Sequence, residues 1–156
     1  MKRYEHTIEI DRTPEEVFEF ISEPGNFPLW QESLLEIREA KGPLRVGREV
    51  TEVRSFMGRK METTWTCTEH EPCTRSSIED DEGPVPFKGT FELEPSGAGG
   101  TSFKWTVETP GPRAIKVPGA IVGRMVKRQL ATDSERLKEL LETGGEEEEA
   151  GVESAA

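Results

Sequence analysis

The sequence has few side chains for metal, redox or membrane chemistry. It contains only two cysteines and two histidines among 156 residues. A metal centre needs a cluster of such ligands, so we expect no metal. The spacing of Cys67 and Cys73 fits no zinc or disulfide motif, and we expect both as reduced thiols. Apolar runs stay well below the ~18 residues of a membrane span, so no stable membrane insertion is expected. The first residues lack the apolar core of a secretory signal, which predicts a cytoplasmic protein.

The charge balance is acidic and the common cofactor motifs are missing. Asp and Glu number 31 against 20 Lys and Arg, a net charge of -11, which argues against nucleic acid as a partner because phosphate binding needs a basic surface. The glycines of Gly97–Gly100 precede a strand rather than a helix, and no P-loop, G-x-S-x-G or dinucleotide fingerprint occurs. We therefore expect no cofactor.

Hydrophobic periodicity predicts one strand, two short helices, six strands and a long helix. Tyr4, His6, Ile8 and Ile10 alternate with polar residues, as in a half-buried strand. Thr13 fits a helix N-cap before Pro14 and Glu16. Further strands are expected at Leu34–Ala40, Gly47–Met57, Lys60–Cys67, Arg75–Asp80, Phe87–Leu93 and Phe103–Val107, and a helix from about Ile115 to Glu142.

The helix is expected to stop at Thr143, where two glycines follow. Beyond them lies a four-carboxylate run, Glu146–Glu149, in a polar segment. The prediction is one domain over residues 1–142 and a disordered acidic tail over residues 143–156. The long helix must bury its apolar stripe, and the concave face of a twisted antiparallel sheet is the available surface. The expected fold class is α+β, a curved sheet of about seven strands around the C-terminal helix, with a cavity between them.

The order of elements and several segments resemble the START-like, polyketide cyclase/dehydrase superfamily with its helix-grip fold. The resemblance extends from Met1 to Glu142 and rests on these segments: Ile8–Phe18, Glu23–Trp30, Val46–Gly47, Phe87–Pro95, Gly99–Trp105 and Arg136–Leu141. Members include lipid and sterol carriers, hormone receptors, aromatase/cyclases and hydroxylase subunits. The resemblance implies the fold, and no catalytic residue is carried over with it.

The candidate ligand-binding residues are those expected to face the cavity. Apolar contact is predicted from Met61, Trp65, Phe91, Trp105 and Met125, and from Trp30 in the aromatic segment Phe27–Trp30. That segment is also the predicted entrance of the cavity, together with the loops at Gly83–Pro84 and Pro110–Pro112. His6 and Thr63 are expected to orient the ligand. His6 and Asp80 are the catalytic candidates, because each can exchange a proton if it faces the cavity.

The register of Val46–Met57 is open, since a shift by one residue would invert every side chain and the alternation of its apolar residues is imperfect: Val50, Val53 and Phe56. Four charged residues lie on strands whose facing the pattern does not fix, namely Glu52, Arg54, Arg48 and Arg75. Surface charge is the default interpretation. One Arg/Glu pair inside the cavity would instead orient a carboxylate or hydroxyl of a ligand.

Three functions are compatible with these features. The first is binding or transport of a small hydrophobic molecule, such as a lipid, polyketide or aromatic metabolite. The second is a polyketide cyclase or dehydratase that uses acid/base residues of the cavity. The third is a ligand-free partner-binding module, which an exposed apolar patch on the outer sheet face would favour. A monomer or a homodimer is expected.

Overall fold

The computed structural model describes residues 1–38, 42–114 and 116–155, with residues 145–155 described by their backbone alone. Its elements are β1 (Lys2–Ile10), α1 (Pro14–Ile21), the 3-10 turn η1 (Pro24–Asn26), α2 (Phe27–Trp30), β2 (Leu34–Arg38), β3 (Glu49–Phe56), β4 (Arg59–Glu71), β5 (Arg75–Asp80), β6 (Phe87–Ser96), β7 (Gly100–Thr109) and α3 (Gly119–Ala155). The predicted end of the second strand at Ala40 lies outside the described residues, as does the expected helix start at Ile115.

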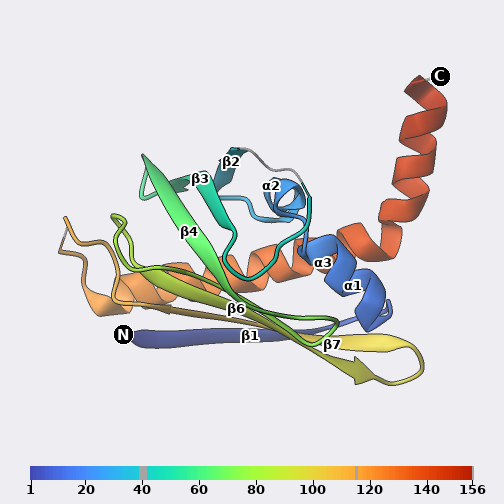
Figure 1. Ribbon diagram of the computed structural model, residues 1–156, viewed down its shortest axis with the longest axis horizontal. Coiled ribbons are helices and arrows are strands. Elements are labelled where there is room, and N and C mark those ends of the chain that lie inside the picture. Colours follow the sequence, from blue (N-terminus) through green and yellow to red (C-terminus); the bar gives the residue numbers. More distant parts are fainter. Residues whose placement is uncertain (39–41, 115, 156) are drawn as a thin grey trace.

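The seven strands form one antiparallel sheet in the order β1-β7-β6-β5-β4-β3-β2. The sheet is strongly curved, and α3 lies across its concave side with α1 and α2 at one end (Figure 1). This arrangement confirms the predicted α+β fold and the order of its elements.

Local sequence signals explain where the elements begin and turn. The Thr13 side chain accepts a hydrogen bond from the backbone N–H of Glu16 at 3.2 Å, which is the predicted cap of α1. Met57 and Gly58 both have positive φ, as a two-residue hairpin turn between β3 and β4 requires. The turn thus lies one residue earlier than the gap between the predicted strands Gly47–Met57 and Lys60–Cys67.

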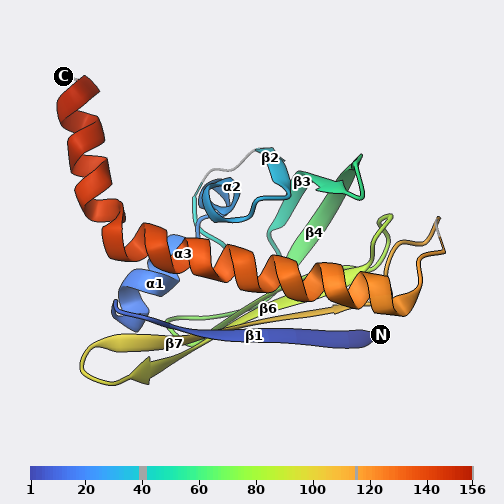
Figure 2. The same ribbon diagram turned by 180° about the vertical axis from the view of Figure 1, so that it is seen from behind.

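Aromatic rings make up much of the core between the sheet and α3. Trp30 of α2 is fully buried and packs against Phe91, Phe103 and Trp105, with ring centroids 5.1 to 6.4 Å apart. Figure 2 shows α3 crossing the sheet. From α3 the core receives Val122, Val126, Leu130 and Leu137, a stripe at helical spacing.

The predicted stop of α3 at Thr143 is wrong. The backbone continues as helix through Gly144 to Ala155, and this last part turns away from the sheet (Figures 1 and 2). The Thr143 hydroxyl donates to the Glu139 carbonyl at 2.6 Å, a bond to the preceding turn that is compatible with continued helix and favours bending. The glutamates that follow are good helix formers. No helix of the described residues has the length and apolar character needed to cross a membrane.

Candidate functional site

A cavity of about 120 Å³ lies between the concave face of the sheet and α3. Most of its lining is apolar. The sheet contributes Phe56, Met61, Ile78, Phe87, Phe91 and Trp105 among others, and α3 contributes Val126 and Leu130. A small, mainly apolar pocket with a few polar groups is the usual form of a binding site for a small molecule.

The polar part of the lining is centred on Glu52 and Arg54 of β3. Both side chains face the cavity because Glu52 pairs with Thr63, and Arg54 with Met61, across the β3–β4 ladder. Arg54 Nε donates to Glu52 Oε2 at 2.7 Å, and Trp65 Nε1 donates to Glu52 Oε1 at 2.5 Å. Glu52 is 2% exposed. The cavity wall therefore contains a buried carboxylate whose charge is matched by a guanidinium.

The structure fixes the register that the sequence left open. Val50, Glu52, Arg54 and Phe56 face inward, and Val53 faces outward opposite Glu62. The alternation of Val50, Val53 and Phe56 is imperfect because two charged residues, Glu52 and Arg54, take inward positions. The internal Arg/Glu pair that would orient a ligand is present as Glu52 and Arg54.

Side chains from two other segments complete the polar network. Arg54 Nη1 donates to Ser33 Oγ at 2.8 Å and Arg54 Nη2 donates to Gln31 Oε1 at 2.7 Å. Gln129 of α3 donates to the same Ser33 hydroxyl at 2.9 Å. Gln31 and Gln129 both line the cavity, so the network ties β3, the segment after α2, and α3 together at one wall.

Asp133 of α3 lies beside this network and is 1% exposed. One carboxylate oxygen accepts a hydrogen bond from the Glu32 backbone N–H at 3.2 Å, and the other has no partner among the described residues. Burial raises the pKa of Asp133 to about 6, although that hydrogen bond and the charge of Arg54 act in the opposite direction. Its proton occupancy therefore changes close to neutral pH.

Four of the predicted ligand-binding residues line the cavity, namely Met61, Thr63, Phe91 and Trp105. Trp65 and Trp30 do not, because both are completely buried in the core behind the wall. Trp65 supports the site from behind through its bond to Glu52. Met125 is also outside the lining, and its neighbour Val126 takes that place.

The two catalytic candidates lie outside the cavity lining. His6 has the predicted inward register on β1, opposite Trp105, yet it lies in a surface hollow against Thr132 and Glu135 of α3. Asp80 is buried, but its carboxylate accepts the backbone N–H groups of Glu82 and Gly83 at 3.1 to 3.2 Å and so stabilises its own loop.

The remaining titratable candidates have structural roles. His70 of β4 is half-buried, with Nδ1 3.1 Å from Ser76 Oγ and its ring 4.9 Å from that of Phe18. Burial lowers its pKa. Cys67 is buried, and burial raises the pKa of its thiol, as expected for an apolar filler. The described residues contain no group of three or more side chains suited to holding a metal.

Segments of the predicted entrance contribute to the cavity lining. Val85, from the loop after Gly83–Pro84, and Gly111, from Pro110–Pro112, line the cavity. Phe27 also lines it, but it is only 1% exposed and therefore forms an inner wall rather than a gate. Phe56 and Met61, half-buried at the end of the β3–β4 hairpin, complete the accessible side.

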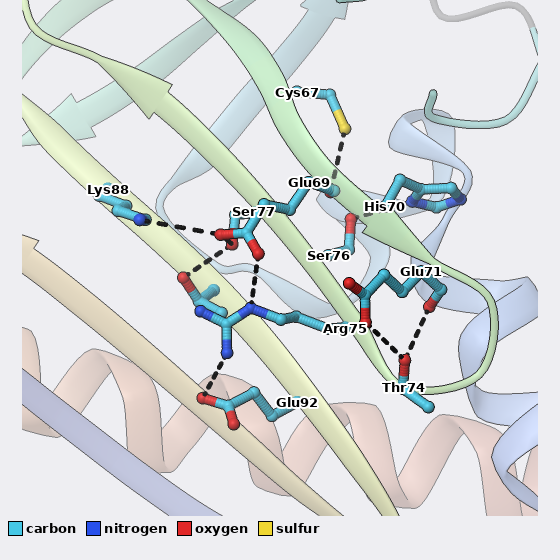
Figure 3. Close-up of polar contacts among 11 residues, drawn as sticks. Cys67, Glu69, His70, Glu71, Thr74, Arg75, Ser76, Ser77, Lys88 and Glu92 are labelled. Carbon is cyan, nitrogen blue, oxygen red and sulfur yellow. Dashed lines mark hydrogen bonds and ion pairs between the residues drawn. The ribbon is translucent and has the colours of Figure 1, made fainter. Parts of the chain in front are cut away.

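The outer sheet face is charged. Arg75 Nε donates to Glu69 at 2.9 Å and Arg75 Nη1 lies 3.5 Å from Glu92, while Lys88 lies 3.8 Å from Glu69 (Figure 3). The large hydrophobic residues that are exposed in the described part of the chain lie elsewhere, none of them on β5, β6 or β7. The apolar patch that would have favoured a partner-binding module is thus not found on these strands.

Solved structures with the same fold come from bacterial proteins of several kinds. A START superfamily protein from Mycobacterium smegmatis superposes with a TM-score of 0.75 at 13% identity, covering 90% of this chain and 97% of that one. The Zhui aromatase/cyclase from Streptomyces sp. R1128 gives 0.74 at 14% identity, covering 91% and 94%. The di-domain aromatase/cyclase BexL of the BE-7585A biosynthetic pathway gives 0.69 at 22% identity, covering 91% of this chain and 47% of that one.

These similarities establish the fold, and the sequence establishes the family. No protein among those with curated descriptions matches in sequence. Residues 1–142 match the family described as polyketide cyclase / dehydrase and lipid transport, which covers every element of the sheet and the sheet-bound part of α3. The chain therefore belongs to the polyketide cyclase / dehydrase and lipid transport family.

Proposed function

We propose that the protein binds a small, mainly apolar molecule that carries a neutral oxygen group, such as a phenol, alcohol or ketone. The apolar body would lie against Phe91, Trp105 and Met61, and the oxygen would lie at the polar wall near Arg54 and Gln129. The observation that carries the proposal is the internally neutralised Glu52–Arg54 pair in a mainly apolar lining.

The pair argues for a neutral ligand on electrostatic grounds. Arg54 already donates to Glu52, Ser33 and Gln31, and its positive charge is balanced by the Glu52 carboxylate. A ligand carboxylate would lose its hydration without gaining an uncompensated cation, and it would approach Glu52 at close range. A hydroxyl or carbonyl needs only one or two hydrogen bonds, which the free N–H groups of Arg54 and the Gln129 amide can supply.

The test compares three ligands of one shape: naphthalene, 2-naphthol and 2-naphthoate. Trp105 lines the cavity, so quenching of tryptophan fluorescence reports binding. We expect 2-naphthol to bind about fivefold tighter than naphthalene, as one net hydrogen bond provides, and 2-naphthoate to bind weakest. Tightest binding of 2-naphthoate would contradict the neutral-ligand argument.

Two substitutions at adjacent helix positions locate the binding. Val126→Phe fills the cavity and should abolish quenching by 2-naphthol, whereas Met125→Phe, which lies outside the lining, should leave it intact. Equal binding by both variants would place the ligand elsewhere. Gln129→Met should remove the preference for 2-naphthol and keep the affinity for naphthalene.

A cyclase or dehydratase is the second candidate, favoured by the carboxylate of Glu52 in the cavity wall. Glu52 would take a proton from a methylene between two ketones, because His6 and Asp80 do not reach the cavity. Ring closure with loss of water from a linear poly-β-ketone would then fall sharply in Glu52→Gln, while 2-naphthol binding persists. Unchanged turnover in Glu52→Gln would eliminate this candidate.

A further inference from the structure

The segment from Thr109 to Thr132 contains no acidic residue, in a chain whose net charge is -11. The same segment contains five Lys or Arg side chains: Arg113, Lys116, Arg124, Lys127 and Arg128. Arg113 donates to the carbonyls of Gly83 and Asp81 and so belongs to the loop structure. The other four are exposed at the beginning of α3 or just before it.

These cations form one surface with the first residues of β1. Arg124, Lys127 and Arg128 share a face of α3 by their spacing, and Arg124 and Lys127 line a surface hollow together with Lys2 and Gly119. Lys2 Nζ also lies close to Gly119, where a Cβ would come within 3.0 Å of it. We call Lys2, Lys116, Arg124, Lys127 and Arg128 the basic face. None of its members makes an ion pair within the part of the chain that the structure describes.

The basic face includes an exposed apolar residue and borders the cavity. Ile121, on the same helix turns, is 43% exposed. Val122, the next residue, lies against Gly111, where a Cβ would come within 3.4 Å of Val122 Cγ2, and Gly111 lines the cavity. The described C-terminal end of α3 lies at the far end of the molecule (Figures 1 and 2).

We propose that the basic face docks the protein peripherally on an anionic phospholipid surface, with Ile121 inserted between the headgroups. Five exposed cations without counter-charges match such a surface, and the positive end of the α3 dipole adds to the attraction. The overall negative charge does not prevent contact, since at physiological salt it is screened beyond about 8 Å. An exposed isoleucine among the cations favours a bilayer over an acidic protein, because it gains by entering the interface. Docking here would place the Gly111 side of the cavity next to the lipid.

The experiment is cosedimentation of the full chain with vesicles of phosphatidylglycerol and phosphatidylcholine, compared with vesicles of phosphatidylcholine alone. We expect binding only to the anionic vesicles, and weaker binding as salt rises from about 50 to about 300 mM. Each Lys or Arg near an anionic surface strengthens binding about fivefold, so Arg124→Gln/Lys127→Gln/Arg128→Gln should weaken it about 100-fold. Ile121→Ser should also weaken binding to the anionic vesicles relative to the wild-type chain, without changing its salt dependence.

A matched control separates the basic face from net charge. Arg45, Arg59 and Lys60 are exposed cations that lie before β3 and at the start of β4, outside the basic face, and Arg45→Gln/Arg59→Gln/Lys60→Gln changes the net charge by the same amount. This control should bind like the wild-type chain, and circular dichroism should show all variants folded. The proposal is overturned by absence of wild-type binding to the anionic vesicles, by equal binding to neutral vesicles, or by an equal loss in the control. Tight capture by an acidic protein with no vesicle binding also overturns it.

Discussion

Glu52→Gln is the substitution that tests the polar wall most directly, because it removes one negative charge with almost no change in shape. The amide can still accept from Trp65 Nε1, where Glu52 Oε1 now accepts at 2.5 Å. Its NH2 group cannot accept from Arg54, whose Nε now donates to Glu52 Oε2 at 2.7 Å. The guanidinium is then left in the cavity wall without a counter-charge.

The structure sets the size of the expected loss. Breaking a fully buried ion pair costs about 3–5 kcal/mol, chiefly because the remaining charge is buried and unpaired. Here the side chain of Glu52 is 3% exposed but that of Arg54 is 24% exposed, so water reaches the charge that remains. Arg54 also keeps its bonds to Ser33 and Gln31. We therefore expect the free energy of unfolding to fall by about 2–3 kcal/mol.

Urea unfolding followed by tryptophan fluorescence measures this change. A loss of that size should lower the urea midpoint by about 1 M or more at an unchanged slope. The double variant Glu52→Leu/Arg54→Met removes both charges and should lose less than Glu52→Gln alone, because neither charge remains to be desolvated. Thr64→Val, an exposed position on β4, serves as a control for general effects on the sheet.

Two outcomes would refute the reasoning. A Glu52→Gln midpoint within error of the wild-type value would mean that the pair does not hold the wall together. A double variant that loses as much as the sum of Glu52→Gln and Arg54→Met would mean that the two side chains act independently, against the short Nε–Oε2 distance.

Two further predictions concern Asp133 and the glycines. Burial raises the pKa of Asp133 to about 6, so between about pH 4 and pH 6 the native state keeps a proton that the unfolded chain has released. The free energy of unfolding should therefore fall by up to about 3 kcal/mol as the pH rises from about 4 to about 6. Asp133→Asn should remove this decline in urea midpoints measured across that range, and a parallel decline in both proteins would disprove the assignment. Gly83→Ala should destabilise, since a Cβ there would lie 2.2 Å from Asp80 Oδ2, whereas Gly144→Ala, with nothing within 4 Å, should stabilise by about 0.5–1 kcal/mol in thermal unfolding. A stabilising Gly83→Ala together with a destabilising Gly144→Ala would contradict both glycine predictions.

The architecture could be predicted from the sequence where residues follow a simple period. The β1 alternation, the Thr13 cap and the apolar face of β4 at Met61, Thr63 and Trp65 all agree with the structure. In these segments the hydrophobic residues are the buried ones, so the pattern and the packing contain the same information.

His6 shows a second limit of sequence-based prediction. Its inward register on β1 was predicted correctly, but it lies outside the cavity lining where it was expected. The inward face of β1 is packed against α3, while the cavity is lined by β7 and by the strands from β6 to β3 beyond it. Alternation tells which face a side chain takes but not which part of that face a helix covers. Only the path of α3 across the sheet separates the two.

Buried polar residues interrupt the hydrophobic period in two elements of the candidate site, β3 and α3. In β3, Glu52 and Arg54 occupy inward positions, so the hydropathy pattern points to Val53 instead. In α3 the buried residues include Asp133, which hydropathy would place in solvent, and of the adjacent apolar residues Met125 and Val126 only Val126 lines the cavity. A polar residue is buried at such a position only when partners satisfy it, as Trp65 does for Glu52 and Glu32 does in part for Asp133. The partners come from other parts of the chain. The breaks in the hydrophobic pattern therefore mark these positions in the sequence, but only the folded structure shows which side chains pair with them.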